Sequence, residues 1–246
     1  VEVFFTIIRI VMAELVLLEQ IKEKASKKKK TIVLPESHDE RVLRAAEILT
    51  AQNIVNVITI GNESKVREDA EKIGINLQGV RIINPETSDK LSDFSNLFFN
   101  QRKHKGVTIE QARETMKKDL FFGAMLVKEG MADGNVAGSF ASTGDVLRAA
   151  IQVVGMAEGI SIVSSFFLMV YPEITYSFAD CAVVPNPDAI QLADIAISTA
   201  DNHKKLTGEE PYVAMLSFST KGSAEHELID KVRAATQFIK DKRPDL

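Results

Sequence analysis

The amino-acid sequence predicts an α/β fold in which mostly parallel β-sheets are covered by helices on both faces. Short apolar runs alternate with helical patterns along most of the 246 residues. The runs are apolar at successive positions, which is typical of strands buried on both faces of a parallel sheet. Hydrophobic residues make up 45% of the chain, enough for the core of one large or two modest domains.

The predicted elements follow from this alternation. Five apolar runs are expected to form strands, at 31–35, 54–61, 80–85, 135–139 and 160–170. Helical patterns separate or follow them, at about 38–52, up to about 73, through about 90–130, at about 142–157 and at about 224–240. Because ligands of such sheets lie at the carboxyl ends of the strands, the loops that lead from strands into helices are where we look for chemistry.

Composition excludes several classes of function. The net charge of −4 argues against a general binder of nucleic acid, which needs a basic excess. The single cysteine, Cys181, allows no intrachain disulfide, and the four histidines lack metal-ligand spacing. The sequence contains no G-x-G-x-x-G, G-x-S-x-G or H-E-x-x-H motif. We therefore expect a cytoplasmic protein without a metal, and without dinucleotide or serine-hydrolase chemistry.

The first eighteen residues are apolar but are not expected to cross a membrane. Glu2, Arg9 and Glu14 interrupt the apolar stretch, and it lacks the features of a signal peptide. We expect an amphipathic helix or a leader. Met12 resembles a natural start, so residues 1–11 are interpreted as an upstream extension.

The loop after the first predicted strand, PESHDER, contains Ser37 and, three residues later, Glu40. This spacing predicts a capping box, in which the two side chains satisfy free N–H groups at the start of a helix. His38 lies beside it, but the sequence shows no carboxylate or nucleophile to pair with it as an acid or base.

A second loop, Gly138–Ala150, has two interpretations. Ser142 and Thr143 lie at a predicted helix start, where free N–H groups and the helix dipole attract phosphate, and Arg148 follows about one turn later. The alternative is an ordinary capped helix with a surface pair between Asp145 and Arg148.

Two further segments carry hydroxyl or basic groups. The run Met215–Glu225 contains Ser219, Thr220 and Lys221 before a predicted helix, which suits either a phosphate-contacting loop or a capped turn. It lacks the spacing of a nucleotide-binding P-loop. The cluster 101–106, QRKHKG, is by itself typical of a solvated surface.

Five segments, in order and at natural intervals, resemble the phosphotransacetylase family. They read KKTIVLPESHDERVLRAA, RKHKGVT, STGDVLRAAIQ, VSSFFLM and AMLSFSTKGSA, and the similarity extends from about Met12 to Leu246. The resemblance implies transfer of an acetyl group between acetyl phosphate and coenzyme A. It leaves open a phosphate butyryltransferase of the same superfamily, or an acetyl-CoA-binding regulatory domain.

The resemblance also implies an architecture and a set of binding residues. We expect two three-layer αβα domains, similar to isocitrate and isopropylmalate dehydrogenases, at residues 1–159 and 160–246, with the second incomplete. The family is usually dimeric and binds its substrates between the domains. The arginines of its basic cluster and helix-start motifs bind coenzyme A and fall here on Arg102 and Arg148, whose planar guanidinium groups suit phosphate.

The resemblance assigns no catalytic residue within the chain. The coenzyme A thiol must lose a proton, and cations must stabilise the oxyanion and the departing phosphate. In the family a serine, an arginine and an aspartate around an N-D-L-S-R-G-type motif do this, and no such motif occurs here. We therefore expect coenzyme A and an acyl phosphate as ligands, no separate cofactor, and no appreciable acetyl transfer by these 246 residues alone.

Overall fold

The computed structural model describes residues 16–220 and 222–246. The interpretation of residues 1–11 as an extension therefore lies outside the described residues. The chain divides into two compact units. The first comprises Lys22–Gly155, and the second comprises Met156–Leu246 together with residues 16–21.

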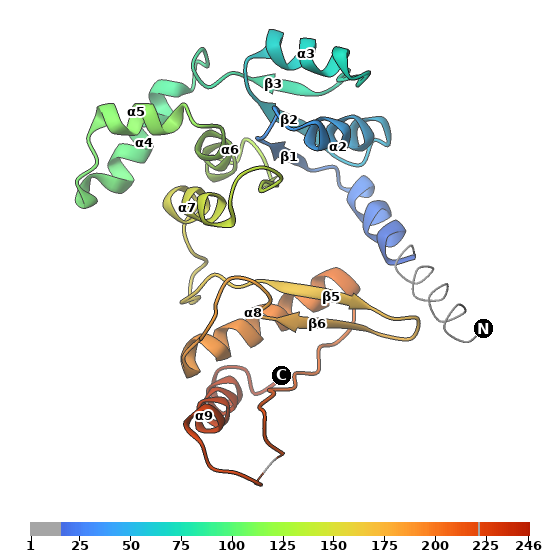
Figure 1. The fold of residues 1–246 in the computed structure, drawn as a ribbon, viewed down its shortest axis with the longest axis vertical. Helices are drawn as coiled ribbons and strands as arrows, with labels where there is room; N and C mark the ends of the chain where they lie inside the picture. The colour runs from blue at the N-terminus through green and yellow to red at the C-terminus, as the bar shows by residue number, and fades with distance from the viewer. Residues whose placement is uncertain (1–15, 221) are drawn as a thin grey trace. The chain divides into compact units, whose positions relative to one another are not determined.

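The first unit is built on a four-stranded parallel sheet (Figure 1). Its strands are β1 (Thr31–Leu34), β2 (Asn56–Ile60), β3 (Arg81–Ile83) and β4 (Gly134–Asn135), in the spatial order β3-β2-β1-β4. Every neighbouring pair is parallel, with Val33 opposite both Ile58 and Asn135. The predicted parallel sheet is thus confirmed in this unit.

Helices cover both faces of this sheet, because successive residues of each strand point to opposite sides. Leu34 and Val57 pack with α2 (Glu40–Ala51) and α3 (Glu63–Lys72). Val33 and Ile58 face the opposite way, into a core that α6 and its neighbouring helices complete (Figure 1). The helices of this second layer are α4 (Leu91–Arg102), α5 (Ile109–Met116), α6 (Asp119–Lys128) and α7 (Thr143–Val153), with a short 3₁₀ helix, η1 (Lys103–Lys105), after α4.

The start of α2 differs from the prediction. Asp39 is the N-cap, and its side chain accepts a hydrogen bond from the backbone N–H of Arg41. Ser37 is buried, and its hydroxyl donates instead to the carbonyl of Ile60 at 2.6 Å. Glu40 accepts from Arg44 one turn along the helix. The capping box of Ser37 and Glu40 was therefore wrong, because the end of β2 offers Ser37 an acceptor that no local pattern reveals.

The fourth strand is shorter than the predicted 135–139. The backbone N–H of Val136 still donates to Val33, but the chain then leaves the sheet. Gly138 has a positive φ of 104°, which a residue with a side chain rarely adopts. Its N–H group bonds to a side chain instead of a strand.

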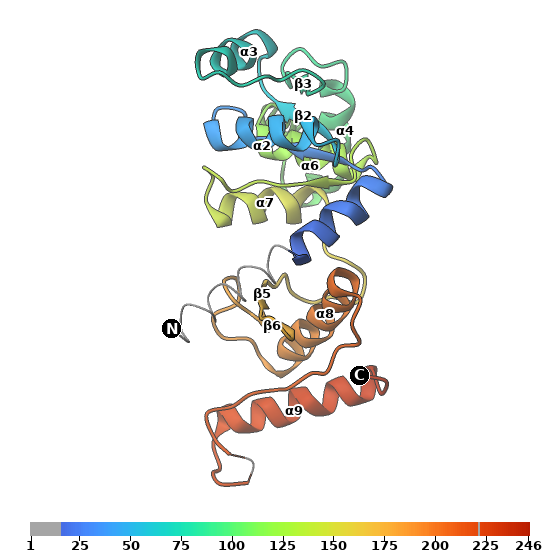
Figure 2. The ribbon, with the colours of Figure 1, turned by 90° about the vertical axis from the view of Figure 1, so that its right-hand side faces the viewer.

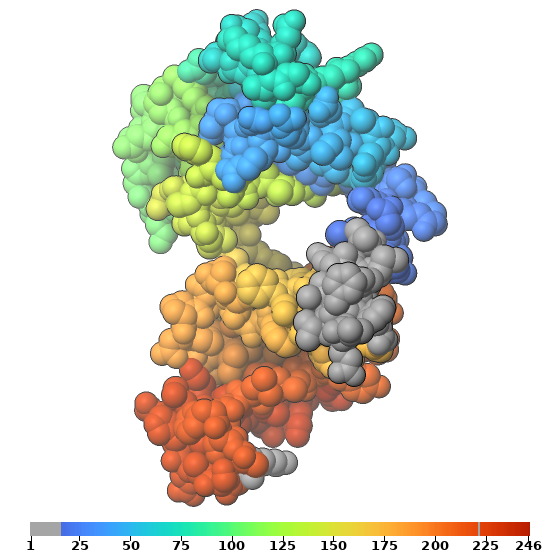
Figure 3. All heavy atoms as spheres, turned by 45° about the vertical axis from the view of Figure 1, so that its right-hand side comes forward, coloured from blue at the N-terminus to red at the C-terminus, as the bar shows by residue number. Residues whose placement is uncertain are grey.

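The second unit contains a β-hairpin and two long helices. Strands β5 (Phe166–Val170) and β6 (Thr175–Ala179) are antiparallel, and α8 (Ala189–Thr207) lies against the hairpin (Figure 2). Helix α9 (Glu227–Lys242) packs on α8 around Ala193 and Ala235. In the space-filling view of Figure 3, the red atoms of the C-terminal segment lie against the orange atoms that precede them in the chain.

This hairpin departs from the expected parallel arrangement within the described part of the unit. Residues 171–174, which join the two strands, are too few for a parallel pair, whose crossover takes a dozen residues or more. The predicted strand 160–170 also begins only at Phe166. Ser161 donates its N–H and hydroxyl groups to Asp194 of α8, so this position bonds to a helix and not to a neighbouring strand.

The core of the first unit yields a stability prediction. Phe122 of α6 is fully buried, with its ring 5.1 Å from that of Phe94. Phe122→Ala leaves a cavity, and we expect it to lower the free energy of unfolding by about 3–5 kcal/mol. Urea unfolding followed by circular dichroism checks this. The control is Ile48→Ala on α2, where the side chain is 52% exposed and the expected change is within about 0.5 kcal/mol. Equal effects of the two changes would contradict the assigned core.

Candidate functional site

The strand order of the first unit points to one edge of its sheet. From β1 the chain moves outward to β2 and β3, then returns to the other side of β1 with β4. In open α/β sheets, ligands bind where the strand order reverses, at the carboxyl ends of the strands. Here that place is the end of β1, at Pro35 and Glu36, and the loop 136–142 after β4.

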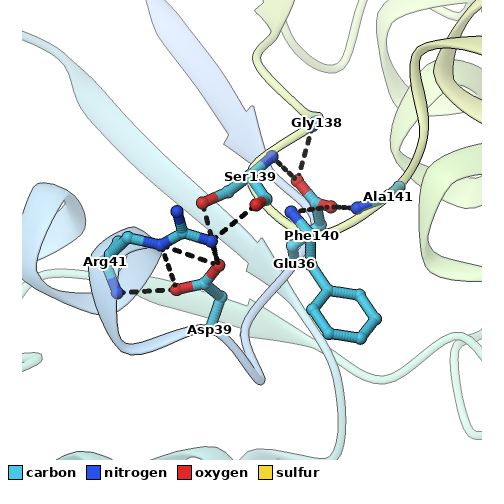
Figure 4. A network of polar contacts seen from close by, with 7 residues as sticks. All are labelled: Glu36, Asp39, Arg41, Gly138, Ser139, Phe140 and Ala141. Carbon is cyan, nitrogen blue, oxygen red and sulfur yellow. Dashed lines mark hydrogen bonds and ion pairs between the residues drawn. The ribbon is translucent and has the colours of Figure 1, made fainter.

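Glu36 occupies this switch point and accepts hydrogen bonds from four consecutive backbone N–H groups (Figure 4). One carboxylate oxygen accepts from Gly138 at 2.6 Å and Ser139 at 2.9 Å. The other accepts from Phe140 at 3.0 Å and Ala141 at 2.6 Å. Burial alone would raise the pKa of Glu36, but these N–H groups outweigh it and hold the pKa below its usual value. The side chain is therefore a buried, ionised anchor for the loop.

A second contact holds the same loop from the side of α2 (Figure 4). The hydroxyl of Ser139 donates to Asp39 at 2.8 Å, and the guanidinium of Arg41 bridges Asp39 and the Ser139 carbonyl at 2.6 Å each. The hydrogen bond from the Arg41 side chain, followed by that from Ser139, holds the pKa of Asp39 well below its usual range. Glu36 and Asp39, which follow β1, thus both bind the loop that follows β4.

A pocket of about 940 Å³ opens beside this loop within the first unit. Glu36, Phe140 and Ala141 belong to its lining. The apolar part of the wall comes from α4, α6 and the connecting segments, and includes Phe98, Val107, Leu120 and Phe121. Five acidic residues line it, namely Glu36, Glu110, Glu114, Asp119 and Asp145. Two permanent cations, Lys118 and Arg148, and the imidazole of His38 also line it.

Asp119 is the most perturbed acid of this pocket. It begins α6, and burial raises its pKa to about 6 even though the nearby His38 opposes the shift. No hydrogen bond to its carboxylate is present among residues 16–220 and 222–246. The ring of His38 meets that of Phe140 edge to face, with centroids 4.9 Å apart. The structure thus brings His38 to a carboxyl group that the sequence pattern did not reveal.

Three of the predicted binding residues lie at the N-cap and in the first two turns of α7. Ser142 is the N-cap, and its hydroxyl both accepts from the N–H of Asp145 and donates to the Asp145 carboxylate. Thr143 is the first residue of the helix. Arg148 lines the pocket and pairs with Asp145 at 2.7 Å, with both side chains at least half exposed. This is the capped helix with a surface pair, and it leaves the phosphate-binding role of these residues as a prediction.

Arg102 ends α4 and is not among the residues that line the pocket. Its Nε is buried and has no hydrogen-bond partner in the described part of the chain. The neighbouring basic residues are exposed, with Lys103 bonded to Asn100 and near the ring of Phe99. The described contacts therefore bring Arg148, but not Arg102, to the pocket wall.

The loop predicted to contact phosphate in the second unit is bonded to itself. The Ser219 hydroxyl donates to the Thr220 carbonyl at 3.0 Å and lies 2.8 Å from the hydroxyl of Ser223. Lys221, the cation of this prediction, lies outside the described residues. The pocket described above draws all of its lining from the first unit.

Within the described ranges, no group of histidine, cysteine, aspartate and glutamate side chains is arranged to hold a metal ion. None of the described helices combines the length and apolar character needed to cross a bilayer.

The first unit, with its parallel sheet, switch-point loop and adjoining pocket, has the design of an α/β enzyme domain that binds a ligand at its strand ends. Residues 16–246 match the family model described as phosphate acetyl/butaryl transferase. The chain belongs to this family, and the resemblance to phosphotransacetylases noted in the sequence is confirmed.

Relatives that are similar to this chain are named phosphate acetyltransferase. A phosphate acetyltransferase of Thermoanaerobacterium thermosaccharolyticum is 47% identical over 94% of this chain and 71% of its own length. The phosphate acetyltransferase of Bacillus subtilis is 42% identical over 94% of this chain and 71% of its own length. The chain thus corresponds to about 70% of the length of these relatives.

Two solved structures share the fold. A phosphotransacetylase from Streptococcus pyogenes has a TM-score of 0.88 and 40% identity, covering 94% of this chain and 70% of its own. The EutD phosphotransacetylase of Staphylococcus aureus has a TM-score of 0.85 and 41% identity, covering 93% of this chain and 69% of its own.

The raised pKa of Asp119 predicts that the stability of the protein depends on pH. Because the folded state raises the pKa from 3.8 to about 6, it binds the proton more tightly than the unfolded state does. The stability gained in this way is present below about pH 4 and lost as the pH rises through 6. After allowance for solvent screening of this partly exposed group, we expect a loss on the order of 1 kcal/mol.

Asp119→Asn should remove this loss, because an amide does not titrate. Unfolding free energies of the two proteins, measured at intervals from pH 4 to 7, should diverge as the pH rises, with the variant relatively more stable at pH 7. Curves that stay parallel over that interval would show that Asp119 is not desolvated in the folded protein.

Proposed function

We propose that this protein is a phosphate acetyltransferase, which transfers acetyl between acetyl phosphate and coenzyme A. The observation that carries the proposal is the similarity to proteins named phosphate acetyltransferase, at 41–48% identity across 91–94% of the chain. The family description covers butyryl as well as acetyl transfer, but the names of these relatives favour acetyl. They do not favour a regulatory acetyl-CoA-binding domain.

The reaction needs coenzyme A as a substrate and not as a resident cofactor. Its thiol gives up a proton, and the sulfur attacks the acetyl carbonyl. The bond between the carbonyl carbon and the phosphate oxygen then breaks, giving a thioester and inorganic phosphate. The base and the groups that stabilise the oxyanion are not assigned to residues of this chain.

Coenzyme A carries a 3′-phosphate and a pyrophosphate, so its binding requires cations at the site. We propose Arg148 at the pocket wall and Arg102 at the end of α4 for this role, with Ser142 and Thr143 at the start of α7. Arg148 is free to serve because an exposed ion pair such as that with Asp145 contributes only about 0–1 kcal/mol. A bidentate bond to phosphate replaces it favourably.

Other expectations from the family stay proposals of the same kind. They are contacts of Ser219, Thr220 and Lys221 with phosphate, binding between two domains at residues 1–159 and 160–246, a homodimer, and a cytoplasmic location. The self-bonded hydroxyls of the 217–223 loop, like Arg148, would have to exchange partners when phosphate binds.

The two arginines give the first test of the binding site. A hydrogen bond to a charged group contributes about 1.5–3 kcal/mol, so Arg148→Ala and Arg102→Ala should each raise the KM for coenzyme A roughly 10- to 100-fold. Steady-state kinetics with the purified complete enzyme measure this. Arg44→Ala is the matched control, because Arg44 pairs with Glu40 on α2 and does not line the pocket. Wild-type KM values in both alanine variants would refute the assignment.

Acyl preference is tested by comparing acetyl phosphate with butyryl phosphate. One misfitting methylene in a pocket changes specificity by about 10- to 200-fold, so we expect kcat/KM at least about 10-fold higher for acetyl phosphate. Thioester formation measures both rates. A preference for butyryl phosphate would place the protein with the butyryl branch of its family.

A further inference from the structure

The loop 138–141 has the form of an anion-binding site. Consecutive backbone N–H groups that converge on one point make a concave site for phosphate or carboxylate. Here four successive N–H groups, from Gly138 to Ala141, converge on the Glu36 carboxylate (Figure 4). The site lies at the switch point of the sheet, where an open α/β domain binds its ligand. Its occupant is nevertheless a side chain of the protein itself.

We infer that Glu36 is a positioning residue for coenzyme A binding, and this inference rests on the function proposed above. The loop that Glu36 holds runs directly into Ser142, the N-cap of α7, and Arg148 lies in the second turn of that helix. Glu36 and Arg148 line the same pocket from different elements. The carboxylate therefore sets where the start of α7, and with it the Arg148 guanidinium, meets the ligand.

Only an ionised carboxylate can fill this role. Each of its oxygens accepts two N–H groups. In Glu36→Gln the amide NH₂ replaces one oxygen and is itself a donor, so it faces two N–H groups that it cannot satisfy. Asp in this position is one methylene shorter and withdraws from the loop. A phosphate group of the substrate cannot use these N–H groups while Glu36 is in place.

The loop does not depend on Glu36 alone for its approximate position. Ser139 is bonded to Asp39 and to Arg41, and Val136 is still bonded to β1. We therefore expect Glu36→Gln to fold, with the loop and the first turn of α7 displaced or less ordered and not lost.

The test measures coenzyme A binding by isothermal titration calorimetry. Glu36→Gln should weaken binding roughly 10- to 100-fold, because two of the four bonds that fix the loop are lost. Glu40→Gln is the matched control, since Glu40 lies at the start of the adjoining helix, pairs with Arg44 and does not line the pocket. It should bind as the wild type does. Wild-type affinity in a folded Glu36→Gln protein would overturn the inference.

Chemical rescue separates positioning from a general loss of structure. Glu36→Ala leaves the N–H groups without their anion, and formate is small enough to take its place. Formate, compared with chloride at equal ionic strength, should restore most of the coenzyme A affinity of Glu36→Ala and leave the wild type unchanged. Equal effects of the two salts on the variant would count against an anion at this position.

A measurement that needs no substrate keeps the two proposals apart. Amide hydrogen exchange at 138–141 and in the first turns of α7 should be faster in Glu36→Gln than in the wild type or Glu40→Gln. Unchanged exchange in α7 would overturn the inference even if coenzyme A does not bind. Failure of the wild-type protein to bind coenzyme A would instead overturn the proposed function.

Discussion

A carboxylate that is buried away from water needs hydrogen-bond donors, and its cost without them reaches several kcal/mol. In the first unit, Glu36 is only 3% exposed, and the backbone of a loop 102 to 105 positions further along the chain supplies the donors. The need for hydrogen-bond partners is mutual. The loop supplies donors to the buried carboxylate. The carboxylate is in turn the common acceptor for four N–H groups that no longer bond to the sheet. The position of the loop at the carboxyl ends of β1 and β4 depends on these hydrogen bonds to Glu36, because β4 has two residues with which to hold the chain to the sheet.

Much of the fold was predictable because the strands of the first unit are buried on both faces and read as continuous apolar runs. TIVLP and IVNVITIG could hardly be solvent-facing strands, and the structure places β1 and β2 within them. Which strands pair, and in which direction, was harder to predict from local sequence patterns. The antiparallel direction of β5 and β6 follows from a short connection that could be recognised only once both strands were known. The cap of α2 moved from Ser37 to Asp39 because the carbonyl that Ser37 contacts belongs to another strand.

The candidate site could be predicted only in part, because some of its contacts join segments that are distant in sequence. Arg148 and the helix start at Ser142 form a local pattern, and the structure shows that arrangement. In the sequence, Glu36 is one polar residue of the PESHDER loop, and nothing near it indicates its role, because its hydrogen-bond partners lie in a distant segment. The available signal was topological: an acidic residue directly after the first strand, facing a Gly-containing loop after the strand that returns beside it. Asp119 gave no comparable signal, because its pKa is raised by burial in the folded unit, which no local pattern reveals.

The charges of the pocket limit how a phosphate-bearing ligand can lie in it. Carboxylates outnumber permanent cations in the lining, so the interior repels phosphate. The Arg148 side chain is 59% exposed, and among the described residues its ion pair is with Asp145. The function proposed above therefore implies that the phosphates lie near this exposed arginine, and the apolar walls suit an uncharged part of the ligand. Asp119 lies among those walls without a hydrogen-bond partner in the described structure and can accept an N–H group from that uncharged part. A ligand that joins phosphates to a long neutral arm with amide groups, as coenzyme A does, meets both conditions at once.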